Sequence, residues 1–267
     1  MSFFDSHTHL GSPELLREAD ELLERAREAD VRGIIAVGAG YGLPANAGAL
    51  AIAERHRDVW ATVGLHPHDA SEWGERAATA LDGWLAHPRV VAVGECGLDY
   101  YYEHSARERQ RAALRAQIRI ALEQKLPLVI HVRASPSSRD AFDELLEIFD
   151  DESADRVGGV IHCFTGDQRF AQDCLARGFD ISFSGILTFK KADELRDVAR
   201  ALPLERLLIE TDSPLLAPVP RRGRRNEPAF VPHVAACLAE LCGRAPEEIA
   251  ERTWERTHHI FGLRERA

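Results

Sequence analysis

Residues 90–97 read VVAVGECG, a run of small and β-branched apolar residues that ends near a carboxylate, Glu95. The run lacks the polar–apolar alternation of a strand with one wet face, so it predicts a strand that is covered on both faces. The stretch PLVIHVR at 127–133 begins in the same way. Strands of this kind need helices on their faces, so both stretches indicate an α/β protein with a parallel sheet.

Eight β-type runs alternate with helical segments along the chain. The runs are FFDSHTH (3–9), RGIIAVG (32–38), VWATVGLH (59–66), VVAVGECG (90–97), PLVIHVR (127–133), GGVIHCF (158–164), DISFSG (180–185) and RLLIETD (206–212). Leucines and alanines recur at three- and four-residue intervals, as amphipathic helices require, in the segments 13–30, 46–57, 106–124, 138–149, 168–177 and 192–201. The triplet Ser12-Pro13-Glu14 predicts the start of the first helix.

This alternation predicts a (β/α)8 TIM barrel, regular or distorted, with extra C-terminal helices at 229–242 and 246–261. The alternative fold is an open, doubly wound sheet. That fold usually carries a glycine-rich phosphate loop after its first strand, where this chain has His7-Thr8-His9. No linker, low-complexity tract or internal repeat interrupts the sequence, so we expect residues 1–267 to form one domain.

Composition narrows the class of protein. No apolar stretch reaches the ~18 residues of a membrane span, and the N-terminus lacks a signal peptide, so we expect a cytoplasmic protein without membrane contact. The five cysteines include no C-x-x-C, which argues against a disulfide framework or a zinc ribbon. The net charge of −10 argues against non-specific coating of nucleic acid but allows a local phosphate or cation site. We expect a monomer rather than an oligomer.

Histidines and carboxylates end several of the predicted strands. Barrel enzymes assemble their sites at these ends, so the side chains should converge on one mouth. They are His7, His9, His66, Glu95, His131, His162, Glu210 and Asp212. Imidazole and carboxylate together suit a binuclear divalent-metal site, where a bridging water becomes a hydroxide nucleophile near neutral pH. Asp212 could ligate a metal and also take the proton of the attacking water.

Three neighbouring residues are interpreted differently. Asp5 shares a strand face with His7 and His9 but lies deeper in the predicted barrel, so we expect a supporting hydrogen bond rather than metal ligation. His66 should face the mouth and contact a substrate phosphate or a metal-bound water. His68, which follows a proline, is interpreted as a loop residue.

Basic and aromatic residues near the strand ends are candidates for substrate contacts. Arg133, which ends the predicted fifth strand, is a candidate phosphate clamp, because guanidinium suits phosphate oxygens. The run RRGRRN at 221–226 is the dense basic stretch of the chain, and Arg222 and Asn226 are its candidate substrate contacts. The tyrosines at 100–102 could stack on an unpaired base. A solvated basic loop and simple loop packing remain the alternatives.

Six motifs stand in the order and spacing of a known family: HTH (7–9), GECGLDYYY (94–102), PLVIHVR (127–133), HCFTG (162–166), ETDSPLL (210–216) and RNEP (225–228). From about residue 3 to residue 262 the chain resembles the TatD family, metal-dependent deoxyribonucleases of the amidohydrolase superfamily. The resemblance implies a distorted TIM barrel with two or three divalent cations, often magnesium or manganese, and the donor set itself also accepts zinc and nickel. The ligands it implies, with Glu95 as the bridge, are His7, His9, Glu95, His131, His162 and Asp212.

The activity that the resemblance implies is hydrolysis of DNA phosphodiester bonds by a 3′–5′ exonuclease acting on single strands or 3′ ends. Glu95 and Asp212 are then the catalytic residues. Leu215 departs from the family pattern, in which an aromatic residue often follows the proline. Two other functions stay open: an ester or amide hydrolase with the same metals, such as an aminoacyl-tRNA deacylase or a lactonase, and a non-catalytic binding module.

Overall fold

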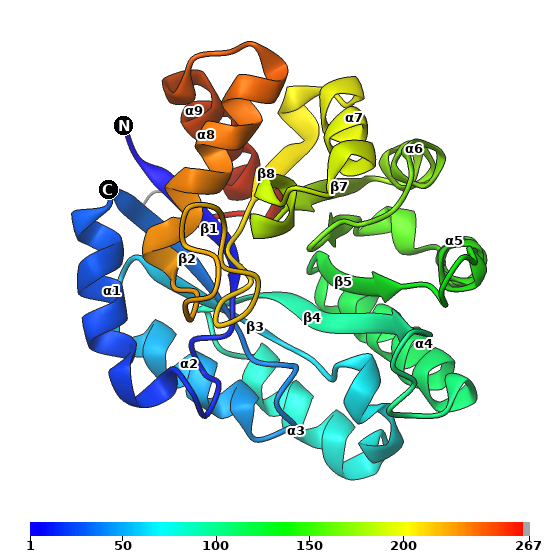
Figure 1. Cartoon of the computed structure of the whole chain (residues 1–267). Helices are drawn as coiled ribbons and strands as arrows, with labels where there is room; N and C mark the ends of the chain where they lie inside the picture. Colours follow the sequence, from blue (N-terminus) through cyan, green and yellow to red (C-terminus); the bar gives the residue numbers. More distant parts are fainter. Residues whose placement is uncertain (264–267) are drawn as a thin grey trace.

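The computed structural model describes residues 1–263 and contains one sheet of eight parallel strands (Figure 1). Each strand pairs with the next one along the chain. The strands are β1 (Phe3–Thr8), β2 (Val31–Val37), β3 (Val59–Val63), β4 (Val90–Asp99), β5 (Leu128–Arg133), β6 (Gly159–Ile161), β7 (Phe179–Phe183) and β8 (Leu207–Ile209). The predicted (β/α)8 barrel is therefore confirmed, and its open alternative is wrong. The assignment of all 267 residues to one domain stays a prediction.

Helices surround the strands (Figure 1). They are α1 (Ala19–Glu28), α2 (Ala45–Arg55), α3 (Glu75–Leu85), α4 (Arg107–Gln124), α5 (Asp140–Glu152), α6 (Gln168–Ala176), α7 (Asp193–Ala201), α8 (Val231–Cys242) and α9 (Pro246–Ile260). Short 3-10 turns are η1 (Leu16–Glu18), η2 (Pro67–Glu72), η3 (Ala154–Arg156), η4 (Gly185–Thr188), η5 (Leu204–Arg206) and η6 (Pro228–Phe230). Within residues 1–263, no helix combines the length and the apolar character that crossing a bilayer requires.

Two helical predictions need correction. The first helix begins at Ala19 rather than at Ser12, because residues 11–15 form a tight turn packed against α2. The Ser12 carbonyl accepts from the Leu16 backbone N–H at 2.9 Å, and a Cβ on Gly11 would lie 2.7 Å from the Ala49 backbone nitrogen. The helix α3 was not predicted, since Gly83 and a threonine weaken its helical pattern.

Apolar side chains fill the interior of the barrel. One buried cluster joins strand residues such as Phe4, Val91 and Leu208 to Phe261, which follows α9. The ring of Trp254, in α9, meets the ring of Phe4 edge to face at a centroid distance of 5.4 Å. Because Phe4 lies near the start of β1, this packing closes the amino-terminal end of the barrel. Each large side chain buried in this way contributes about 1.5–3 kcal/mol.

Polar contacts join the first strand to the last. The chain beyond β8 forms a parallel bridge between Thr8 and Ser213, and the His9 backbone N–H donates to the Ser213 carbonyl at 2.9 Å. Asp5 is fully buried at this seam and accepts from the backbone N–H and the hydroxyl of Thr211, at 2.8 and 2.6 Å. This supporting hydrogen-bond role agrees with the sequence interpretation of Asp5. Burial raises the pKa of Asp5 to about 8.

We predict that Asp5→Ala lowers the free energy of unfolding by about 3 kcal/mol, because it leaves the buried Thr211 donors without an acceptor. The midpoint of urea unfolding, measured in EDTA so that no bound metal contributes, tests this. Asp5→Asn keeps the shape of an uncharged carboxyl and should lose less. The control is Asp82→Ala on the exposed face of α3, which should change stability by less than about 0.5 kcal/mol. Equal midpoints for the two alanine variants would contradict the role of Asp5.

Candidate metal centre

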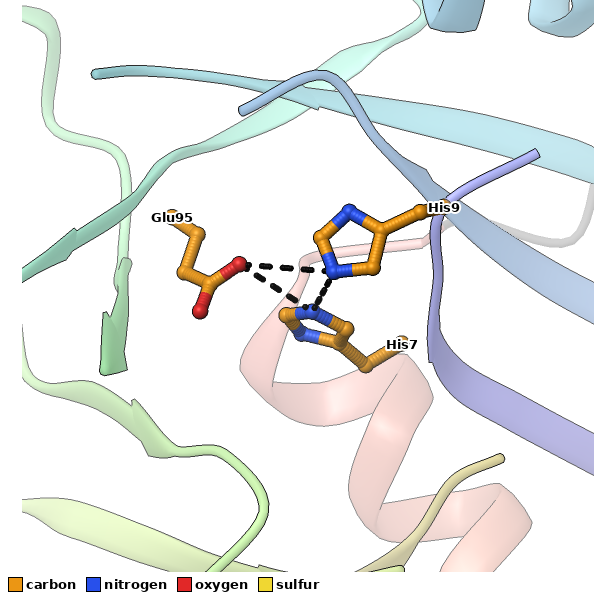
Figure 2. Close-up of side chains that lie close together, drawn as sticks. All are labelled: His7, His9 and Glu95. Atoms are coloured by element: carbon orange, nitrogen blue, oxygen red, sulfur yellow. Dashed lines mark hydrogen bonds and ion pairs between the residues drawn. The ribbon is translucent and has the colours of Figure 1, made fainter. Parts of the chain in front are cut away.

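The carboxylate of Glu95 lies between two groups of side chains at the carboxyl end of the barrel. The residue belongs to β4 and is 1% exposed. Its Oε2 atom lies 3.4 Å from His7 Nε2 and 3.6 Å from His9 Nε2, which approach from β1 and the residue after it (Figure 2). Asp212 completes this first group, with its Oδ1 atom 3.3 Å from His9 Nε2 and 3.8 Å from His7 Nε2.

The second group faces the other oxygen of Glu95. Its Oε1 atom lies 2.7 Å from His162 Nε2, 3.0 Å from His131 Nδ1 and 3.3 Å from His66 Nε2. The two groups therefore share one carboxylate, one oxygen each. All six residues that the sequence names as ligands meet here, and His66 joins them from the start of the η2 turn, which follows β3.

Electrostatics keep Glu95 ionised in spite of its burial. Burial alone would raise its pKa, but the positive charge on His162 and the hydrogen bonds with His131 and His162 hold the pKa well below its usual range. Burial lowers the pKa of His66 to about 4, so that imidazole is neutral near pH 7. The carboxylates of Glu95 and Glu210 raise the pKa of His162 well above its usual range in spite of burial, so that ring carries a proton that a bound metal ion would displace.

The donor atoms fit divalent cations. Glu95 Oε2 is buried and has no hydrogen-bond partner among residues 1–263, although the Nε2 atoms of His7 and His9 lie near it. Ligand atoms lie within 4.8 Å of one another in three sets: His7–His9–Glu95, His7–His162–Asp212 and His66–Glu95–His131. A buried anion needs a compensating charge, and mixed imidazole and carboxylate donors suit zinc, manganese, nickel and related ions. The side chains can hold two adjacent cations with Glu95 between them.

Two further carboxylates contact histidine rings of the centre at the nitrogen that points away from Glu95. Glu210 is buried, accepts from the Cys163 backbone N–H at 2.7 Å and lies 3.3 Å from His162 Nδ1. Asp99 lies 3.0 Å from His131 Nε2. Such partners fix the orientation of a ring and leave its other nitrogen facing the centre. Asp99 had no assigned role, but its spacing from Glu95 along β4 is even, which places both on one face of the strand.

His68 lies closer to the centre than its interpretation as a loop residue implies. The turn η2 brings His68 Nε2 to 3.0 Å from Asp99 Oδ2, and its ring centroid lies 4.4 Å from that of His66. The backbone N–H of His68 donates to His66 Nδ1 at 3.1 Å, which leaves His66 Nε2 directed at Glu95. The proline between the two histidines thus starts a turn that orients both.

A cavity of about 570 Å³ opens over the centre. Tyr102 and Arg133 form part of its rim, and the Arg133 guanidinium carbon lies 4.0 and 4.9 Å from the ring centroids of Tyr101 and Tyr102. These two tyrosines are about half exposed, whereas Tyr100 is buried and donates its hydroxyl to Glu144. Only two of the three tyrosines can therefore offer a stacking surface.

Two residues of the basic run 221–226 differ in exposure: Asn226 is buried, and Arg222 is exposed. The predicted substrate contact of Asn226 is not supported, because the side chain is fully buried and cannot reach a ligand directly. Its amide donates to the carbonyl oxygens of Thr211 and Leu215, at 2.8 and 2.6 Å, and so holds the loop after β8. Arg222 is exposed, and its guanidinium carbon lies 3.8 Å from the ring centroid of Phe189.

Comparisons with known proteins agree with this architecture. A family model described as TatD related DNase matches residues 4–262. The metal-dependent hydrolase YabD of Bacillus subtilis is 39% identical over 97% of this chain and 99% of its own length. The 3′-5′ ssDNA/RNA exonuclease TatD of Klebsiella pneumoniae is 37% identical over 97% of this chain and 98% of its own.

A solved structure, the TatD homologue YjjV of Escherichia coli, superposes with a TM-score of 0.89 at 31% identity over 98% of both chains. The hydrolase TatD family protein of Entamoeba histolytica shares the fold, with a TM-score of 0.83 at 21% identity over 97% of this chain and 98% of that one. Matches of this extent confirm the predicted family and the assignment as a hydrolase. The chain belongs to the TatD family of metal-dependent hydrolases.

Proposed function

We propose that this protein is a metal-dependent exonuclease that hydrolyses phosphodiester bonds of single-stranded DNA from the 3′ end. The observation that carries the proposal is the pair of donor groups that share Glu95 at the floor of an open cavity. The activity named for the Klebsiella relative supports the choice of substrate.

The chain offers two cation positions. Glu95 Oε2, His7, His9 and Asp212 would hold one cation, and Glu95 Oε1, His131 and His162 the other, with His66 beside them. When bound, two divalent cations acidify a water molecule and offset the charge of a phosphodiester. Glu210 and Asp99 keep His162 and His131 directed at these positions.

Asp212 is the group placed to accept a proton from the attacking water. It lines the cavity and is 7% exposed, whereas Glu95 is more deeply buried between the histidines. Burial would raise the pKa of Asp212, but the hydrogen bond with His9 and the positive charge on His162 lower it. An ionised carboxylate that reaches the cavity can act as a general base.

Arg133 is the phosphate clamp of this proposal. Within residues 1–263 it has no ion pair with a carboxylate, and Tyr101 and Tyr102 hold its guanidinium at the rim of the cavity. A guanidinium in this position can bind phosphate oxygens in a bidentate way. The exposed tyrosine faces suit an unpaired base and favour a single strand.

We predict that wild-type protein stripped with EDTA binds two Mn²⁺ ions per chain in isothermal titration calorimetry. Glu95→Gln should lower the affinity for both ions by at least about tenfold, because both groups share its carboxylate. Glu144→Gln is the matched control: that carboxylate accepts from Tyr100 nearby but belongs to neither group. Two unchanged binding events in Glu95→Gln would contradict the bridging role.

We predict that the wild type shortens a 5′-labelled single-stranded oligonucleotide one nucleotide at a time in Mg²⁺ or Mn²⁺ and stops in EDTA. Asp212→Asn should lower kcat by roughly 10²–10⁴-fold, the usual contribution of a positioned base. Gel electrophoresis of the products measures both effects. A parallel set of esters, amides and lactones tests the rival hydrolase: their cleavage, with the oligonucleotide left intact, would refute the exonuclease.

A further inference from the structure

A second concave surface adjoins the candidate metal centre. We call it the α5–α7 groove; it has a volume of about 790 Å³ and is formed by the loop before α5, the β6–α6 loop and the β7–α7 loop. Thr165 and Ile186 line both this groove and the cavity over the centre. These two residues therefore form the boundary between the two spaces, and a flexible chain held at the centre would pass over them to reach the groove.

The lining of the groove combines aromatic and neutral polar side chains. Phe142 and Phe189 supply aromatic surface, and Ser137, Ser138 and Gln168 supply hydroxyl and amide groups. A nucleobase presents the matching chemistry, with two apolar faces and polar edges. The volume lies in the usual range for sites that bind small organic ligands.

The charges of the groove disfavour a phosphate. Its lining includes three carboxylates, on Asp167, Glu194 and Asp197, and only two cationic side chains, on Arg139 and Lys191. Arg139 is also engaged by ion pairs with Asp167 and Asp143. Asp197 likewise pairs with Arg200. Within residues 1–263 Lys191 is thus the one lining cation without an ion pair, which is too little positive charge to favour a phosphodiester over a neutral base.

Positive charge gathers instead at the edge of the groove. Arg222 lies over the ring of Phe189, and Lys190 beside that ring is exposed. Within residues 1–263 neither cation has an ion pair with a carboxylate. This arrangement suits a strand whose backbone follows the edge while a base turns inward.

We infer that the α5–α7 groove binds a nucleobase of the substrate strand, at least one nucleotide away from the phosphate at the metal centre, with Phe189 as its stacking surface. The inference rests on the proposed function and deepens it. The protein then senses a second nucleotide through its base, so an oligonucleotide is a better substrate than a single-nucleotide ester.

An abasic scan tests this inference. The substrates are a single-stranded DNA octamer, the same octamer with one abasic nucleotide moved along it, and the p-nitrophenyl ester of thymidine 5′-monophosphate. Phe189→Leu removes the aromatic ring but keeps an apolar side chain. Gln168→Trp fills the groove from an exposed position at the start of α6 and does not depend on how Phe189 packs.

In the wild type, the abasic nucleotide should raise KM on the order of tenfold at one position near the cleaved end, as expected for loss of one stacked base. With Phe189→Leu or Gln168→Trp, the KM for the intact octamer should already be raised by this factor. Placing an abasic nucleotide in the octamer should then not raise the KM of these variants further. The ratio of kcat/KM for the octamer to that for the short ester should fall by the same factor.

Phe230→Leu is the matched control, because Arg221 of the same loop lies over that ring, 5.2 Å from its centroid, outside the groove. It should keep the abasic profile of the wild type. Two results would overturn the inference but not the proposed function. One is a wild-type KM that is the same for every position of the abasic nucleotide, and the other is a dependence on that position that is unchanged in both Phe189→Leu and Gln168→Trp. Absence of cleavage of every phosphodiester would overturn the proposed function and the inference with it.

Discussion

The buried negative charge of Glu95 is the constraint around which the rest of the site is arranged. A lone carboxylate at 1% exposure would be expensive to fold, since burial strips its hydration. The barrel surrounds it with imidazoles from β1, from β5, from the residue after β6 and from the turn that follows β3. Two of these rings have a carboxylate on the side away from Glu95: Asp99 contacts His131, and Glu210 contacts His162.

The two ends of the barrel differ in their side chains: apolar residues pack at one end, and the candidate metal centre lies at the other. At the amino-terminal end, Phe4 and the partly buried Trp254 pack together in an apolar cluster. At the opposite end the same strands present titratable groups under an open cavity. Packing at one end thus provides the rigidity that side chains at the other end need in order to hold fixed distances.

Much of this architecture follows from local sequence. The apolar runs predict all eight strands. The six proposed ligands lie at the carboxyl ends of these runs, and barrel sites are built at those ends, so their meeting can be predicted without knowing the loop paths. Contacts that depend on loop paths were missed: η2 carries His68 towards Asp99, and the loop after β8 folds back over Asn226. The ends of β6 and β8 were also predicted too long, since Cys163 and Thr211 pair with side chains rather than with a strand ladder.

The seam between β1 and the chain after β8 has a consequence for the order in which the candidate metal centre can assemble. The first donor group takes His7 and His9 from the start of the chain and Asp212 from the segment that follows the last strand. A truncated chain that lacks this segment has neither the Thr211 donors that bind Asp5 nor the Asp212 carboxylate that contacts His9. The first donor group is therefore complete only when the segment after β8 lies against β1, so the two ends of the fold must assemble before that cation position exists.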